Sequence, residues 1–432
     1  MGATRGRRKS GRLLAGMALW SLASCSGPAP GPSAAGGPST SRPQGPPTAA
    51  TDTIAKTAEG AAAGGPDGRA AFGTVGPPAT CLAASEVAGW SLSRRAALLV
   101  VVPVLDGDPA AIAVATRAGA GGVLLIGPQP GPAALTATLS PLHRSATPPP
   151  LVMADEEGGG VERLAGDVPS LPWPQEMAST MTPAAVQSAA RNVGAAMKAL
   201  GVTVDLAPVL DLDAGPVVSK TDPDGPRSFS ARPATAGEYG SAFVAGLAQA
   251  GVLGVLKHFP GLGGSSGNTD YEPAATTPLA QLLTGGLVPF EQDIRAGAAA
   301  VMVANASVPG LTPGPASLSP AVIEGLLEQQ IHFHGLVLTD SLSAGAVSAA
   351  GFDLPAAAVA AVGAGADMVL FGSTLTAADT ARLAPGPLAS DVSGIVAAIV
   401  AAVQNAQLSQ PRLDQAVLQV MRARGAELCP GS

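Results

Sequence analysis

Short runs of consecutive hydrophobic residues alternate along the chain with longer alanine-rich stretches. Eight such runs lie at residues 96–104, 121–127, 150–155, 202–211, 254–259, 299–306, 335–340 and 366–372. Continuous rather than alternating hydrophobic positions are typical of parallel strands that are buried on both faces. The intervening stretches predict helices at 184–200, 236–250, 320–330 and 354–363, with a last helical pair beginning near residues 394 and 413. The chain therefore predicts an α/β fold.

Eight strands is the number that a closed barrel requires. The strand-then-helix order favours a single (β/α)8 TIM-type barrel of about 330 residues, with an open doubly wound sheet as the alternative. Active sites in such barrels lie where the strands end, at the carboxyl face. Polar residues end five of the runs: Asp155-Glu156-Glu157, Asp211, Lys257-His258, Asn305 and Asp340. We expect these side chains to converge at one end of the barrel.

The first 80 residues have a different pattern. Residues 1–25 combine a basic start, a hydrophobic stretch too short for an ordinary membrane span and small residues before Cys25, which predicts a signal peptide. Leu22-Ala23-Ser24-Cys25 resembles a bacterial lipobox, so we expect Cys25 to be lipidated; plain cleavage is the alternative. Residues 26–80, rich in Pro, Gly, Ala and Ser, predict a flexible linker. We expect an exported protein, lipid-anchored to the outer face of the bacterial cytoplasmic membrane or cell envelope, with its folded domain at 81–432.

The net charge and the cysteine content limit the ligands, cross-links and metals that we expect for this chain. A net charge of −7 without a long basic run argues against nucleic acid and favours a small neutral ligand. Cys81 and Cys429 stand near the two ends of the folded domain, and in an oxidising exported setting we expect them to pair; two free thiols are the alternative. No Cys or His neighbours have metal-ligand spacing, so we expect no metal and no cofactor. We expect a monomer.

Seven motifs carry a more specific signal. In chain order they are ADEEGGGVERL, APVLDL, RSF, KHFPGLG, PASLS, LVLTDSL and AGADMVLFG. This series resembles glycoside hydrolase family 3, in its single-barrel β-N-acetylglucosaminidase branch, over about residues 95–425. The resemblance implies retaining hydrolysis, in which a carboxylate attacks the anomeric carbon and a separate acid protonates the leaving oxygen. It places the nucleophile at Asp340, where a short side chain on a strand end is held rigidly.

The same resemblance implies a pocket for one sugar. Asp155 aligns with the carboxylate that holds sugar hydroxyls in the family. The polar sugar contacts of the family align with four basic residues: Arg163, Arg227, Lys257 and His258. Hydroxyl-rich ligands need such fixed donors and acceptors. Glu156, Gly160 and Asn305 stand where the family often has Gln, Arg and His, so the motifs do not fix the sugar.

The loop after KHFPG departs from the family. There, the single-barrel branch carries an Asp-Ser-His triplet whose histidine is the general acid/base, and ungapped counting places Asn268-Thr269-Asp270 on it. Of the four histidines in the chain, only His258 is expected at the carboxyl face. We therefore assign the acid/base to Asp270, with Glu272 as the alternative. A carboxyl serves if burial or the neighbouring Asp340 raises its pKa, and Asn268 could orient it.

These assignments predict a retaining exo-glycosidase. We expect it to remove terminal β-linked N-acetylglucosamine, or a related β-sugar, from cell-wall fragments or glycans. A catalytically weak or inactive sugar-binding envelope lipoprotein is the alternative, because the usual Asp-His pair is missing. The glycine-rich loop after KHFPG lacks the Walker lysine and the GxGxxG spacing of phosphate-binding loops, which argues against phosphate binding there. A sugar phosphorylase is disfavoured because Asp270 would repel phosphate.

Overall fold

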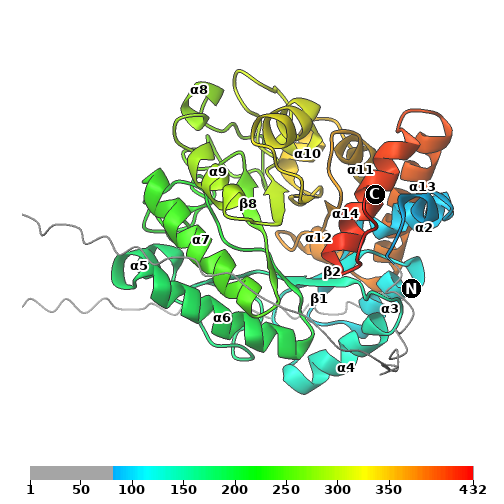
Figure 1. Cartoon of the computed structure of the whole chain (residues 1–432), viewed down its shortest axis with the longest axis horizontal. Coiled ribbons are helices and arrows are strands. Elements are labelled where there is room, and N and C mark those ends of the chain that lie inside the picture. The colour runs from blue at the N-terminus through cyan, green and yellow to red at the C-terminus, as the bar shows by residue number, and fades with distance from the viewer. Residues whose placement is uncertain (1–80, 432) are drawn as a thin grey trace, which may run out of the picture. The chain divides into compact units, whose positions relative to one another are not determined.

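Residues 81–431 are described by a computed structural model and form one α/β unit (Figure 1). The predicted signal peptide at 1–25, with the lipobox Cys25, and the predicted linker at 26–80 lie outside the described residues. Residue 432 lies outside them as well.

Parallel strands form the centre of this unit. One sheet has the strand order β11-β1-β2-β3-β6-β7 and a second has the order β10-β9-β8, while β4 and β5 form a short antiparallel hairpin. The strands are β1 (Val100–Leu105), β2 (Gly122–Ile126), β3 (Leu151–Ala154), β4 (Glu156–Gly158), β5 (Val161–Glu162), β6 (Val204–Asp205), β7 (Leu253–Gly254), β8 (Leu256–Phe259), β9 (Ala300–Val303), β10 (Leu336–Thr339) and β11 (Val369–Leu370).

All eight hydrophobic runs contain strand residues. The two sheets are linked at both sides: only Val255 separates β7 from β8, and Leu338 of β10 forms a parallel bridge with Met368, next to β11. The result is a curled parallel sheet. The predicted α/β fold with a parallel sheet is confirmed.

Helices cover the outside of the curled sheet (Figure 1). They are α1 (Ala84–Ala88), α2 (Leu92–Leu98), α3 (Pro109–Ala118), α4 (Pro132–His143), α5 (Pro174–Thr180), α6 (Pro183–Leu200), η1 (Gly225–Arg227), α7 (Pro233–Gln249), α8 (Leu279–Leu282), α9 (Leu287–Arg295), η2 (Ala316–Leu318), the π-helical η3 (Ala321–Gln330), α10 (Gly345–Ala349), α11 (Leu354–Gly363), α12 (Ala377–Arg382), α13 (Pro385–Gln404) and α14 (Gln410–Ala423). The predicted helices are therefore present, although α13 begins nine residues before the predicted start near residue 394.

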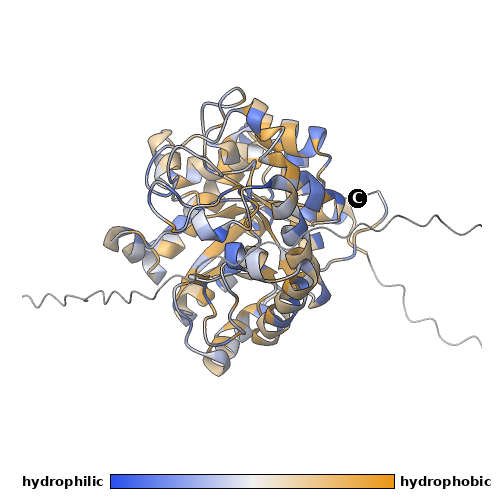
Figure 2. Cartoon of the chain, turned by 90° about the vertical axis from the view of Figure 1, so that its left-hand side faces the viewer, coloured by the Kyte–Doolittle hydropathy of each residue, from blue (hydrophilic) through white to orange (hydrophobic). Residues whose placement is uncertain are grey.

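Strand β1 illustrates why the runs are continuously hydrophobic. Val100 and Val102 pack in the large cluster between sheet and helices, whereas Val101 packs in a second cluster on the opposite face of the sheet. Side chains alternate between the faces of a strand, so a strand buried on both faces must be hydrophobic at every position. Figure 2 shows this hydrophobic colouring along the central strands.

The two ends of the folded unit are joined. Cys81 and Cys429 form a disulfide with a Cα–Cα distance of 4.9 Å, so their predicted pairing is confirmed. Beside it, Leu82 pairs with Leu428 in a parallel bridge. Helix α2 lies beside α13 and α14, at the other end of the chain (Figure 1). Helix α13 is long and apolar enough to cross a membrane, but it packs on α2, α3 and α11 as a helix of this unit.

Candidate active site

A pocket of ≈ 340 Å³ lies at the carboxyl ends of the strands. Its lining includes all seven residues assigned to catalysis or sugar binding: Asp155, Arg163, Arg227, Lys257, His258, Asp270 and Asp340. Asp155 directly follows β3, Lys257 lies in β8 and Asp340 directly follows β10. The expected convergence of polar strand ends is therefore confirmed for these residues, whereas Glu156, Asp211 and Asn305 do not line the pocket.

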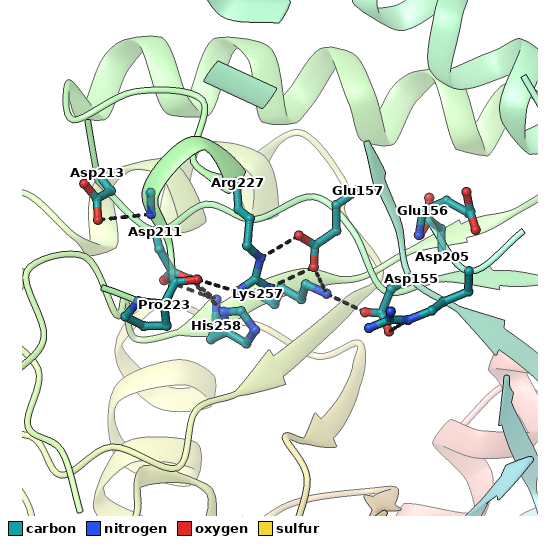
Figure 3. Close-up of polar contacts among 12 residues, drawn as sticks. Asp155, Glu156, Glu157, Asp205, Asp211, Asp213, Pro223, Arg227, Lys257 and His258 are labelled. Carbon is teal, nitrogen blue, oxygen red and sulfur yellow. Dashed lines mark hydrogen bonds and ion pairs between the residues drawn. The ribbon is translucent and has the colours of Figure 1, made fainter. Parts of the chain in front are cut away.

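Lys257 is the buried centre of an ion-pair chain (Figure 3). Its Nζ lies 2.7 Å from Asp155 Oδ1 and 2.5 Å from Glu157 Oε1. Arg227 donates two parallel hydrogen bonds to Glu157, from Nε to Oε2 at 2.8 Å and from Nη2 to Oε1 at 2.9 Å. Burying a charge is costly unless it is paired. Glu157 therefore makes it possible to keep two cations in the pocket wall.

These pairings set the protonation states. Burial would raise the pKa of Glu157, but Arg227 and Lys257 outweigh it and hold that pKa below its usual range. Burial would lower the pKa of Lys257, whereas Asp155 and Glu157 raise it, and the net change is upward. Burial would also lower the pKa of Arg227, but Glu157 raises that pKa by more, so the net change is again upward. Both cations stay charged at neutral pH and can donate hydrogen bonds to a hydroxyl-rich ligand.

Asp155 lies between Lys257 and Arg163. Arg163 Nε is 3.8 Å from Asp155 Oδ2, too long for a hydrogen bond. The backbone N–H of Arg163 donates to the carbonyl of Asp155 at 3.1 Å, because the β4–β5 hairpin returns the chain to the end of β3. Only one carboxylate oxygen of Asp155 is therefore held by a close cation, and the other can accept a ligand hydroxyl.

His258 is neutral and fixed by Asp211. Burial lowers the pKa of His258 to about 4, with Asp340 acting in the opposite sense. Its Nδ1 lies 2.7 Å from Asp211 Oδ2, and the carboxylate of Asp211 also accepts the backbone N–H groups of His258 and Leu262. With the Nδ1 proton directed at Asp211, Nε2 is left as a hydrogen-bond acceptor.

Asp340 is held at the strand end by backbone groups. Its N–H donates to the carbonyl of Val303 at 2.9 Å, and its Oδ1 accepts the N–H of Ser341 at 2.6 Å. Asn305 Nδ2 donates to the carbonyl of Ser341 at 2.8 Å, which steadies the same turn. Burial and the charge of Asp270 raise the pKa of Asp340, while His258 opposes them. Asp340 and Asp270 are thus electrostatically coupled.

Asp270 stands at the pocket mouth, on the loop after β8. Its side chain is solvent-exposed on one side, and its partial burial raises the pKa of Asp270 against the influence of Arg227. Asn268 does not bond to the carboxyl group of Asp270; its Oδ1 accepts the backbone N–H of Asp270 at 2.9 Å. Asn268 therefore fixes the turn rather than the acid itself. Glu272 is exposed and does not line the pocket, whereas Asp270 does.

Two important residues of the site are expected at the carboxyl face from the sequence but are assigned no part in catalysis or sugar binding there. Glu157 pairs with both pocket cations, and Asp211 holds His258. A signal for Glu157 existed: alternation along an extended chain puts it on the same side as Asp155, and Glu156 on the other. Asp211 ends the fourth hydrophobic run, so the rule that located Asp340 also applied to it.

One cluster within residues 81–431 has the composition of a metal site. Ligand atoms of Asp211, Asp224 and His258 lie within 4.8 Å of one another. Asp224 is buried, and its Oδ1 has no hydrogen-bond partner. Burial, reinforced by Asp211, raises the pKa of Asp224 well above its usual range, while Arg227 opposes this rise. The nearby guanidinium of Arg227 would repel a cation bound at this cluster.

Comparison with known proteins agrees with this geometry. Residues 118–423 match the family model described as "Glycosyl hydrolase family 3 N terminal domain". The β-hexosaminidase LpqI of Mycobacterium tuberculosis is 34% identical over 338 residues, which cover 77% of this chain and 82% of the relative. A β-hexosaminidase of Stenotrophomonas maltophilia is 35% identical over 240 residues, covering 54% of this chain and 70% of the relative.

Solved structures show the same relationship. The crystal structure of a family 3 glycosyl hydrolase from Mycobacterium smegmatis has a TM-score of 0.70 and 35% identity, covering 78% of this chain and 98% of the other. The structure of M. tuberculosis LpqI has a TM-score of 0.71 and 33% identity, covering 82% of this chain and 99% of the other. With family motifs, fold and pocket in agreement, this chain belongs to glycosyl hydrolase family 3 and is a glycosidase that acts on O-glycosyl bonds.

Proposed function

We propose that the protein is a retaining exo-glycosidase that removes terminal β-linked N-acetylglucosamine, or a closely related β-sugar, from cell-wall fragments or glycans. The observation that carries this proposal is the presence of Asp340 and Asp270 in the lining of one pocket, beside fixed sugar-binding donors and acceptors. Relatives named β-hexosaminidases support the sugar class.

In this mechanism Asp340 is the nucleophile. Its carboxylate attacks the anomeric carbon and forms a glycosyl-enzyme intermediate, while Asp270 donates its proton to the leaving oxygen. Asp270 then removes a proton from the water that releases the sugar. The raised pKa of Asp270 suits an acid, and the backbone bonds to Asp340 suit a nucleophile that must not move. A retaining reaction requires the two carboxyl groups to stand about 5–5.5 Å apart when the sugar is bound.

The remaining pocket residues bind the sugar. Asp155 accepts its hydroxyls, Lys257 and Arg227 donate to its oxygens, and His258 offers Nε2 as an acceptor. Arg163 is the least constrained member of this set, because its side chain is 38% exposed and makes only a long contact with Asp155. Since the other groups are already paired with neighbouring side chains, they are oriented before the sugar arrives, which lowers the entropic cost of binding.

We propose two further features of the chain. The two sheets form one closed (β/α)8 barrel, supported by the Leu338–Met368 bridge and the single residue between β7 and β8. The N-terminal 25 residues act as a signal peptide with lipidation at Cys25, supported by the basic start, the hydrophobic stretch and the lipobox. The enzyme would then be exported and held at the cell envelope by its lipid, with residues 26–80 as the tether.

A sugar-binding envelope lipoprotein with weak or no catalysis is the second candidate. It is favoured by one observation: none of the histidines but His258 lines the pocket, so the histidine acid of the family has no counterpart here. It predicts that N-acetylglucosamine binds while glycosides remain intact.

Leaving-group dependence tests the proposal. An aryl β-N-acetylglucosaminide needs little protonation to leave, whereas a methyl glycoside needs a full proton. We expect Asp270→Ala to reduce kcat/KM at least about 100-fold on the methyl glycoside and less than about tenfold on the aryl glycoside. Glu272→Ala is the matched control, because Glu272 lies on the same loop outside the pocket, and both rates should be kept.

The outcomes separate the candidates. Equal losses on both substrates would remove Asp270 from the acid role. Turnover of neither substrate by the unmodified protein, with sugar binding intact, would establish the binding protein instead. A fluorosugar adduct on a residue other than Asp340 would refute the nucleophile assignment.

A further inference from the structure

Exposed large hydrophobic side chains gather at the mouth of the pocket. Among residues 81–431, five such side chains stand out: Val217 (62% exposed), Val218 (44%), Tyr271 (44%), Leu283 (40%) and Leu375 (44%). Val218 and Leu375 line the pocket, Val217 precedes Val218, and Tyr271 directly follows Asp270. Leu283, at the end of α8, neither lines the pocket nor adjoins a residue that does. Such a concentration needs a reason, because exposing large apolar groups to water is unfavourable.

These side chains come from three different loops. Val218 lies on the loop after β6, Tyr271 on the loop after β8 and Leu375 on the loop after β11. Lys220 connects the first two, since its ammonium group lies 4.7 Å from the centre of the Tyr271 ring. An apolar rim assembled from separate loops is a property of the site and not of one local segment.

The rim and the floor of the pocket differ in chemistry. The floor presents the charged groups of Asp155, Lys257 and Arg227, which suit hydroxyls. The rim presents aliphatic and aromatic carbon beside Asp270, the residue that faces the leaving oxygen in the proposed mechanism. A sugar on the floor directs its glycosidic bond past Asp270, so the group beyond that bond must lie against the rim.

We propose that the rim of Val218, Tyr271 and Leu375 is a binding subsite for the apolar part of the leaving group, which is an aliphatic or aromatic substituent or the apolar face of a second sugar ring. This inference rests on the proposed glycosidase function and specifies its substrate class. Val218 and Leu375 provide aliphatic walls, and Tyr271 provides the ring face opposite Lys220, which an aromatic group or the apolar face of a second ring can cover.

The test compares leaving groups of one series. We expect kcat/KM of the purified protein to rise from methyl to butyl to hexyl β-N-acetylglucosaminide, by about twofold per methylene, which is below the full transfer value because the rim stays partly wet. The hexyl-to-methyl ratio should fall about tenfold in Leu375→Asn and several-fold in Val218→Thr, both of which keep side-chain size while adding polarity. A naphthyl glycoside tests the contribution of the Tyr271 ring. Tyr271→Leu should weaken binding of the naphthyl glycoside more than binding of the hexyl glycoside.

Leu283→Asn is the matched control. It makes the same change at a leucine of similar exposure outside the pocket, so both the methyl and hexyl rates should be unchanged. A flat rate from methyl to hexyl, or a fall of equal size on both substrates in Leu375→Asn, would overturn the subsite. If no glycoside is hydrolysed, the proposed function fails by itself, and the subsite is tested by calorimetry: hexyl glycoside must then bind more tightly than methyl glycoside, or the subsite is refuted as well.

Discussion

The backbone N–H of Gly345 donates a hydrogen bond to the carbonyl of Asp270 over 2.9 Å. The next N–H, that of Ala346, donates to the carbonyl of Thr269 at 3.0 Å. Helix α10 follows the turn that carries Asp340, so the loop of the candidate acid is fastened to the segment of the candidate nucleophile. The relative placement of the two carboxyl groups therefore depends on these two backbone bonds.

A methyl group at Gly345 should disturb this placement. A Cβ there would stand 2.3 Å from the carbonyl oxygen of Tyr271, a backbone atom, so the loop must shift. A displacement of about 1 Å in a reacting group can cost about 100-fold in rate, and we expect a loss of that order in kcat/KM for Gly345→Ala. Gly363→Ala is the control, because a Cβ at Gly363 meets no atom within 4 Å. An unchanged rate in Gly345→Ala, measured on a methyl glycoside, would show that the loop position is not limiting.

The acidity of the pair predicts an unusual pH profile. Burial raises the pKa of Asp270, and burial together with the charge of Asp270 raises that of Asp340, so the pair loses its two protons in separate steps. In the proposed mechanism, the active form has one proton, on Asp270. Activity on a methyl glycoside should rise with pH through the first loss and fall through the second. Because both pKa values are raised, we expect the optimum at a higher pH than an ordinary aspartate pair would give.

Measurement of kcat/KM from acidic to alkaline pH tests this profile. In Asp270→Asn, the decrease in kcat/KM at high pH should disappear on an aryl glycoside, because residue 270 no longer carries a proton that can be lost. Persistence of this decrease in that variant would assign the second ionisation to another group.

Much of this arrangement follows from the sequence. Continuous hydrophobic runs located the strands, and polar strand ends located Asp155, Lys257 and Asp340, because both signals are local in the sequence. The pairing of Lys257 with Glu157 joins residues far apart in the chain and depends on the mutual placement of β4 and β8. The hydrogen bond of Asn268 to a backbone N–H, rather than to a carboxylate, depends on a local rotamer. Neither detail is encoded in a residue pattern.

Removing Glu157 should test the ion-pair chain. Glu157→Gln leaves Arg227 and Lys257 buried with less countercharge, and breaking a buried pair costs about 3–5 kcal/mol. We expect a clear drop in melting temperature and a raised KM for the methyl glycoside. Glu291→Gln is matched to it, because it breaks the surface pair with Arg295, which is worth less than about 1 kcal/mol. Equal melting temperatures for the two variants would contradict the role given to Glu157.

The disulfide should affect stability and not catalysis. Cys81–Cys429 spans 348 residues, and cross-links over long loops stabilise by about 4 kcal/mol through the entropy of the unfolded chain. Replacing both cysteines by serine should lower the melting temperature while kcat/KM stays within about twofold, because neither residue lines the pocket. The unmodified protein measured with and without reductant provides the comparison. A loss of activity in the folded double variant would show that the joined ends also shape the site.

Glu156 predicts how stability depends on pH. Its side chain is buried away from the pocket lining and accepts the N–H of Leu164 at 2.5 Å. Burial raises the pKa of Glu156 to about 8, with Asp205 adding to the rise and the Leu164 N–H opposing it. The folded state therefore holds a proton that the unfolded chain releases near pH 4.5. Folding stability from this group is complete below pH 4.5 and is lost as the pH rises towards 8.

Glu156→Gln removes this proton while keeping an oxygen for Leu164. One pKa unit corresponds to about 1.4 kcal/mol, so the free energy of unfolding of the unmodified protein should fall by a few kcal/mol between about pH 5 and pH 8 because of this group. The variant should show a smaller decline over the same window, and should be the more stable of the two at the alkaline end. Denaturant unfolding at both ends of the window measures the difference, with Glu272→Gln as the exposed control. Parallel declines in all three proteins would mean that Glu156 is ionised in the folded state, and that the burial of its carboxylate is compensated by groups other than Leu164.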